Sequence, residues 1–187
     1  GFVAYKLGDD TAKNAGRLTL NPIKHLDIMG LIMMVVFHFG WAKPVPVDMR
    51  YFKKPKQGMA LTALAGPVSN VVLAYAAVVL CNFVMFLADR LGSTWLLLAL
   101  AQFFVYVEII SAGLAVFNVF PIPPLDGSKV LFAFLPDSAY EKLMRYEKYG
   151  MIALLILVWL GVGDNVLSTA IYNVYASMIN FVFRGIV

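Results

Sequence analysis

The chain has 187 residues, of which 61% are hydrophobic and 14% are charged, and its mean hydropathy is +0.79. This composition is typical of integral membrane proteins and excludes an ordinary soluble domain. The formal net charge of +4 comes from basic residues clustered in loops, so we expect a lipid bilayer and no nucleic acid as a partner. The single cysteine, Cys81, excludes a disulfide framework and a cysteine-based metal site.

The N-terminal segment begins with apolar residues that are typical of the end of a helix, and Gly8 is a plausible C-terminal stop. We therefore expect the chain to begin inside an element. The polar, turn-rich segment 16–27 follows. Its His25 and Asp27 have two possible roles: they support a metal site from its periphery, or they cap the helices beside an interfacial loop.

Residues 28–42 form an apolar stretch of 15 residues, which is shorter than the ~20 needed to span a bilayer. We expect this stretch to be re-entrant or tilted within the membrane.

Proline alternates with valine in the segment that follows, so this segment is predicted to be extended. Pro44 and Pro46 share one parity, and their missing N–H groups therefore weaken only one edge. The other edge is free to accept an extended peptide by strand addition. We expect Lys43, Pro44, Val45, Pro46 and Val47 to bind such a peptide. The alternative is a rigid interfacial connector.

Long apolar runs make up the rest of the chain. Met59–Ala88 contains no charged residue in 30 positions, and Glu108 is the one charge between Leu91 and Leu125. Residues 149–163 and 165–183 supply one or two further spans. The prediction is an all-α, polytopic membrane protein with four or five membrane helices, a short extended re-entrant segment near 43–47, and a single domain covering residues 1–187.

A proline-rich break interrupts this pattern between Asn118 and Gly127. Three prolines force the chain out of helical geometry immediately before a carboxylate, Asp126. Broken backbone at membrane depth is tolerated where it is buried in protein or lines a watery cavity. A carboxylate there is expected to be paired or bound to a cation. The alternative is a surface loop whose Asp126 caps the next helix.

Four clusters in a fixed order resemble the site-2 protease family of intramembrane zinc metalloproteases, in its compact prokaryotic form without a PDZ domain. They are GDDTAKNAGRLTLNPIKHLD, GWAKPVPV, AGPVSN and NVFPIPPLDG. The resemblance extends from Gly1 to about Leu135, and the C-terminal part matches only as a pair of extra helices.

The resemblance implies an enzyme that hydrolyses a peptide bond of a transmembrane protein substrate inside the bilayer, with a zinc-activated water. It implies that Asp126 is a zinc ligand and that Asn118 is a catalytic residue that stabilises the oxyanion. The Lys43–Val47 segment would hold the substrate extended. The expected location is a prokaryotic plasma membrane.

The sequence departs from the family in one respect, because it contains no His-Glu-x-x-His motif, which supplies two zinc ligands and the general base. The family pattern places that motif immediately before the residues that resemble Gly1–Asp9. We therefore expect a longer active enzyme, and we expect the chain alone to be inactive. The alternatives are an inactive homologue that binds membrane helices and a small transporter or channel in which Glu108, Asp126 and Asn70 line an ion path.

Overall fold

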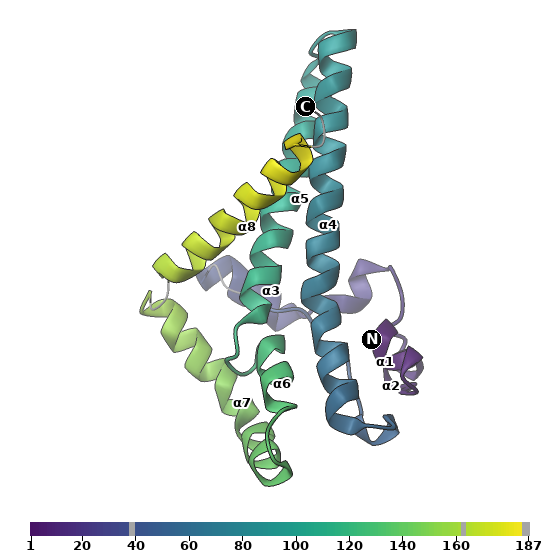
Figure 1. The fold of residues 1–187 in the computed structure, drawn as a ribbon, viewed down its shortest axis with the longest axis vertical. Coiled ribbons are helices and arrows are strands. Elements are labelled where there is room, and N and C mark those ends of the chain that lie inside the picture. The colour runs from purple at the N-terminus through teal and green to yellow at the C-terminus, as the bar shows by residue number, and fades with distance from the viewer. Residues whose placement is uncertain (38–39, 162–163, 185–187) are drawn as a thin grey trace. The chain divides into compact units, whose positions relative to one another are not determined.

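The computed structural model describes residues 1–37, 40–161 and 164–184, and within these residues every regular element is a helix (Figure 1). The all-α prediction is confirmed. In chain order the helices are α1 (Phe2–Lys6), α2 (Thr11–Asn14), the 3₁₀ helix η1 (Pro22–His25), α3 (Ile28–Phe37), the 3₁₀ helix η2 (Met49–Tyr51), α4 (Pro55–Leu91), α5 (Trp95–Val119), α6 (Asp126–Phe132), α7 (Asp137–Trp159) and α8 (Asp164–Arg184).

The chain divides into two compact units, Gly1–Thr62 and Ala63–Val187. The boundary falls inside α4. The prediction of a single domain stays a prediction.

The Gly1–Thr62 unit is held by a small apolar core. Ala4, Phe52 and Met59 are buried together, and partly buried apolar side chains pack against them: Leu7, Val47 and Met49. Residues 40–48 lie in neither a helix nor a strand. The backbone there has no regular ladder of hydrogen bonds, so side chains must fix its position.

Helices α4 and α5 are the two helices of the described chain that are long and apolar enough to cross a membrane. Only 28% and 22% of their most apolar stretches are buried inside the protein, so most of the apolar surface there is not covered by the rest of the chain. The described chain thus has two helices that could span a membrane, by length and composition. The larger number of four or five, and the re-entrant character of residues 28–47, stay predictions.

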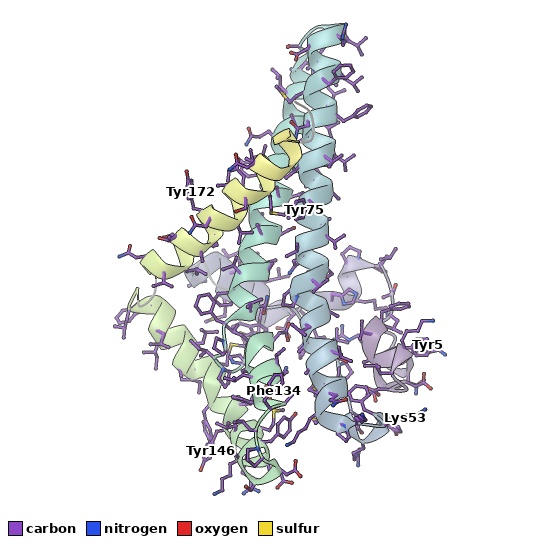
Figure 2. The ribbon with its side chains drawn as sticks, viewed as in Figure 1. Tyr5, Lys53, Tyr75, Phe134, Tyr146 and Tyr172 are labelled. Carbon is purple, nitrogen blue, oxygen red and sulfur yellow. The ribbon has the colours of Figure 1, made fainter. Side chains whose placement is uncertain are left out.

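Small side chains bring three helices of the Ala63–Val187 unit together. Ala74 of α4, Ala112 of α5 and Met178 of α8 form a buried cluster, with Tyr75 packed against it (Figure 2). The Cys81 thiol lies 3.6 Å from the carbonyl oxygen of Ala101, along the same α4–α5 interface. Small residues allow helix backbones to approach closely in apolar surroundings.

The proline-rich break separates α5 from α6, as predicted. Helix α5 ends at Val119, and the backbone is extended at Phe120 and again at Leu125 before α6 begins. Gly127 packs so closely on the end of α5 that an added Cβ would lie 2.0 Å from the Val119 carbonyl oxygen. Gly150 of α7 approaches the break in the same way, with an added Cβ 2.6 Å from the Pro123 carbonyl oxygen. The break is therefore a packed turn within this unit.

Candidate functional site: a carboxylate and an amide in one apolar pocket

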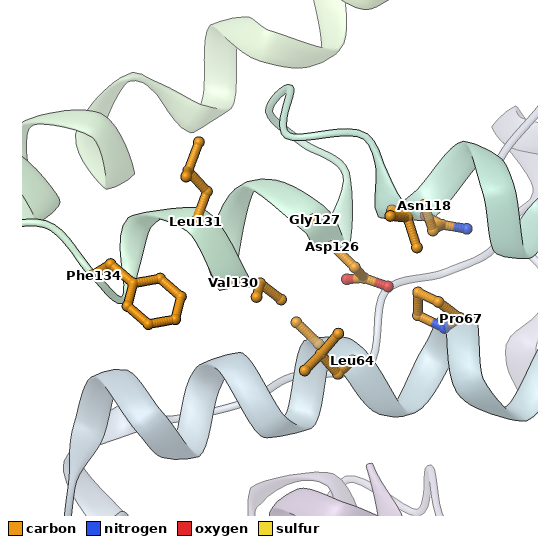
Figure 3. A pocket seen from close by; sticks show the side chains of 10 residues that line it. Leu64, Pro67, Asn118, Asp126, Gly127, Val130, Leu131 and Phe134 are labelled. Carbon is orange, nitrogen blue, oxygen red and sulfur yellow. The ribbon is translucent and has the colours of Figure 1, made fainter. Parts of the chain in front are cut away.

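The carboxylate of Asp126 stands at the first turn of α6. The N-cap of that helix is Leu125, and no side chain caps it through a hydrogen bond. The capping role that the sequence left open for Asp126 is therefore absent. The side chain points toward α4, where it faces Leu64 and Pro67 (Figure 3).

Gly66 makes room for this orientation. A Cβ added to Gly66 would lie 2.9 Å from the Asp126 Oδ2 atom and would meet nothing else closer than 4.0 Å. Pro67 adds to the local opening, because it lies inside α4 and cannot donate to the carbonyl of Ala63, four residues earlier. No spacing along the chain would have paired Gly66 with Asp126.

Asn118 lies in the last turn of α5 and lines the same pocket as Asp126. Its Nδ2 atom donates to the Leu114 carbonyl oxygen at 2.9 Å. The amide nitrogen therefore points back along α5, away from Asp126 (Figure 3). A side-chain amide has two N–H donors, so one remains after this bond.

The pocket shared by these two residues has a volume of about 230 Å³. Its other walls are almost entirely apolar, and they come from three elements on the two sides of the proline-rich break. These lining residues are Ala63, Leu64, Pro67, Val119, Gly127, Val130, Leu131 and Phe134. Phe134 is 84% exposed and projects from the residues that follow α6 (Figure 2). A carboxylate and an amide are thus presented to a cavity suited to an apolar side chain.

Burial raises the pKa of the Asp126 carboxyl above its usual range. The Lys129 ammonium one turn later opposes this effect, while the Glu147 carboxylate adds to it. Lys129 and Glu147 pair with each other, with Nζ and Oε1 3.4 Å apart, and so link α6 to α7. A desolvated carboxylate of this kind favours a cation as its partner.

The described residues do not complete a zinc site by themselves. Among them, no three His, Cys, Asp or Glu side chains lie together in a group that could hold a metal ion. His38 lies outside the described residues. His25 Nε2 is 3.0 Å from the Thr19 carbonyl oxygen, and Asp27 accepts from the Gly30 N–H at 2.9 Å. Asp27 therefore caps α3, which is one of the two roles left open for it.

The predicted peptide-binding residues Lys43, Pro44, Val45, Pro46 and Val47 lie in the Gly1–Thr62 unit. The Lys43 N–H donates to the His25 carbonyl oxygen at 2.9 Å. Side chains alternate in exposure along the segment, with both prolines exposed and both valines half-buried. This alternation is typical of extended backbone.

Two charged residues that the sequence analysis left without a role contact this segment or Asp48, the residue that follows it. Asp9 accepts from the Asp48 N–H at 2.8 Å, and Arg17 donates to the Pro44 carbonyl oxygen at 3.2 Å. Both belong to a motif that carried the family resemblance. Their partners are distant in sequence, so only the folded chain shows what they contact.

The fold and the pocket define an α-helical protein with membrane-length helices and a carboxylate in an apolar cavity. The chain belongs to peptidase family M50, the site-2 protease family, whose family model matches residues 1–161. Members of this family are membrane-embedded zinc metalloproteases. The family predicted from the four clusters is thus confirmed.

Three relatives carry the same kind of name. The chain is 44% identical over 169 residues to "Putative zinc metalloprotease YwhC" of Bacillus subtilis, covering 89% of this chain and 75% of the relative. It is 27% identical to Rip2 of Mycolicibacterium smegmatis, covering 84% and 59%, and 35% identical to MJ0611 of Methanocaldococcus jannaschii, covering 56% and 49%. The chain thus spans between about half and three quarters of these relatives. No solved structure matches it.

Proposed function

We propose that this chain carries part of the catalytic centre of an intramembrane zinc metalloprotease that cuts transmembrane proteins in a prokaryotic plasma membrane. The single observation that carries the proposal is that Asn118 and Asp126 line one apolar pocket at the end of a membrane-length helix. Family membership supplies the class of chemistry, and the bacterial and archaeal relatives support the location.

Asp126 is the proposed zinc ligand. A carboxylate oxygen suits zinc, and this carboxylate is directed into the pocket without capping its own helix. Because the described residues hold no further ligand group beside it, the rest of the metal site is outside this proposal. When bound, zinc would supply the Lewis acidity of the reaction.

Asn118 is proposed to donate its second amide N–H to the negative charge that develops on the substrate carbonyl. The apolar walls of the pocket support this role, because a fixed donor is more effective where water is excluded. Those walls are also proposed to receive an apolar side chain of the substrate next to the scissile bond.

The Lys43–Val47 segment is proposed to hold the substrate as an added strand. A helical peptide keeps its carbonyl groups in internal hydrogen bonds, so cleavage requires an extended conformation. Pairing of backbone groups along one edge supplies that conformation without regard to side-chain sequence.

The test compares Asp126→Asn with the exposed-site control Asp89→Asn in the full enzyme. Asp126→Asn should lose cleavage of a fluorogenic transmembrane peptide and weaken zinc retention against a chelator. Circular dichroism should show that its helices are intact, and Asp89→Asn should behave as the wild type. Unchanged cleavage and zinc content in Asp126→Asn would reject the proposal. Peptide binding without cleavage by the wild type would favour the inactive homologue.

A further inference from the structure

Two charged side chains are buried in the Gly1–Thr62 unit, and both contact the same segment. Asp9 is 0% exposed and Arg17 is 8% exposed. Burying a charged group costs free energy unless hydrogen bonds replace its water. The partners of these two residues therefore indicate what their burial achieves.

The two oxygens of Asp9 serve different elements. Oδ1 accepts from the Thr11 N–H at 2.9 Å and from the Thr11 hydroxyl, which fixes the start of α2. Oδ2 accepts from the Asp48 N–H at 2.8 Å, 39 positions along the chain. Burial alone would raise the pKa of Asp9, but the hydrogen bonds from Thr11 and Asp48 outweigh it and lower the pKa. Asp9 is thus a charged acceptor that ties α2 to residue 48.

Arg17 makes the second contact with the segment through the donors of its guanidinium group. One terminal nitrogen, Nη1, donates to the Lys24 carbonyl oxygen, and the other, Nη2, donates to the Pro44 carbonyl oxygen at 3.2 Å. A guanidinium is planar and presents its donors in a fixed arrangement. Arg17 therefore sets the distance between η1 and the beginning of the proline–valine segment.

Both ties fall on one edge of the segment. In extended backbone, successive residues direct their N–H and C=O groups to opposite edges, so Pro44, Pro46 and Asp48 share an edge. Asp9 and Arg17 hold two of these three residues. On the opposite edge, the Lys43 N–H donates to the His25 carbonyl oxygen at 2.9 Å, whereas the backbone groups of Val45 and Val47 form no hydrogen bond within the described part of the chain.

We propose that Asp9 and Arg17 are positioning residues that grip the proline edge of residues 44–48 and so present the Val45–Val47 edge to the substrate backbone. This inference rests on the strand addition in the proposed function. It assigns a role to two charged residues that touch neither substrate nor metal. The two ties reach the segment near its two ends, so loss of either should let that end rotate and spoil the pairing of the free edge.

The experiment uses the full enzyme in detergent micelles and a synthetic transmembrane peptide with a fluorophore and a quencher. Asp9→Asn replaces one acceptor oxygen by a donor, and Arg17→Lys replaces the fork by a single ammonium that cannot hold both carbonyls. The matched controls are Asp10→Asn, an exposed neighbour, and Arg90→Lys, an exposed arginine. Steady-state kinetics, zinc content, melting temperature and amide exchange of residues 45–48 are measured on each.

Asp9→Asn and Arg17→Lys, which we call the clamp variants, should each raise KM about tenfold, because each removes about one hydrogen bond that aligns the segment. The kcat should stay nearly constant. Zinc content should not change. The Asp48 amide should exchange faster, and bound peptide should protect the Val45 and Val47 amides less than in the wild type. The two controls should match the wild type in every measurement.

A further pair of variants distinguishes the positioning by Asp9 and Arg17, the clamp, from the strand addition itself. Val45→Pro removes a donor from the free edge, whereas Val45→Thr keeps the donor and the β-branched shape. If Val45→Pro raises KM and the clamp variants do not, the clamp is rejected and the strand addition stands. If Val45→Pro has no effect either, the strand addition is wrong and the clamp is rejected with it. Parallel loss of melting temperature, zinc and kcat in the clamp variants would reduce Asp9 and Arg17 to folding roles and overturn the inference.

Discussion

The Asp126 carboxylate lies directly against the backbone of α4 at Gly66, where an added Cβ would stand 2.9 Å from Oδ2. The atom in the way is the end of a side chain and not part of the backbone. A methyl group at this position would therefore displace the carboxylate while leaving both helices in place. The absence of a side chain at Gly66 thus determines where Asp126 can point.

Gly66→Ala is accordingly expected to separate function from stability. Alanine in a helix is favoured over glycine by about 1 kcal/mol, so the melting temperature should stay the same or rise. Zinc affinity should fall by about 10–100-fold, as is common when the surroundings of a ligand are altered, and cleavage should fall with it. Chelator competition and thermal unfolding measure the two effects. Gly113→Ala is the control, since its Cβ would meet only Ile171 Cδ1 at 3.7 Å. Unaltered zinc affinity in Gly66→Ala, alongside a loss in Asp126→Asn, would refute the positioning role.

Gly127→Ala, in contrast, is expected to lower stability and activity together. An added Cβ would lie 2.0 Å from the Val119 carbonyl oxygen, and the backbone there cannot move without opening the proline-rich break. Overpacking of this kind typically costs about 1–3 kcal/mol. We expect a lower melting temperature together with lower activity, measured on the same samples as Gly66→Ala. A stable but inactive Gly127→Ala would contradict this account of the break.

Asn118→Ala tests whether the amide acts on the reaction or only on its helix. Asn82 is a matched control, because its Nδ2 donates to the Val78 carbonyl oxygen at 2.8 Å, the same four-residue bond that Asn118 makes to Leu114 at 2.9 Å. Both substitutions should change stability by a similar amount. Only Asn118→Ala should lower kcat, by about 10²–10³-fold, with zinc content retained. Equal activity of the two variants in single-turnover cleavage would exclude the oxyanion role.

The Gly1–Thr62 unit is expected to lose stability in acid because of Asp9. Its pKa is lowered in the folded chain, so its stabilising effect is fully present above the unfolded value of 3.8 and is lost as the pH falls through the folded value. Asp48 also has a lowered pKa, through its pairing with Arg50, and acts in the same direction. Amide exchange of residues 1–62 between about pH 3 and pH 6 should show faster opening at the acid end. Asp9→Asn should flatten that dependence more than Asp48→Asn does, because Asp9 is the more deeply buried of the two. An unchanged slope in Asp9→Asn would show that its charge is not what holds the segment.

Several features could be predicted from the sequence because they depend on local physics. Hydrophobic runs with at most one charged residue predicted α4 and α5, and proline chemistry predicted the end of α5 before Asp126. The proposed pairing of Asn118 with Asp126 relied on the family resemblance, and the structure places both in one pocket. These features require only the chain in their immediate neighbourhood or a motif of known order.

The sequence by itself thus determined the helical class and the family, and it predicted the residues that are proposed to carry the chemistry. Only the tertiary structure decided that Gly66 leaves the space for Asp126, and that Asp9 and Arg17 hold the Pro44–Asp48 edge. The physical reason is that these contacts join residues 27 to 60 positions apart, and a glycine or a charged side chain carries no local sign of its distant partner. Periodicity and turn chemistry depend on the conformational preferences of the local backbone and can be seen in the sequence. Packing and long-range hydrogen bonds, in contrast, exist only once the chain has folded.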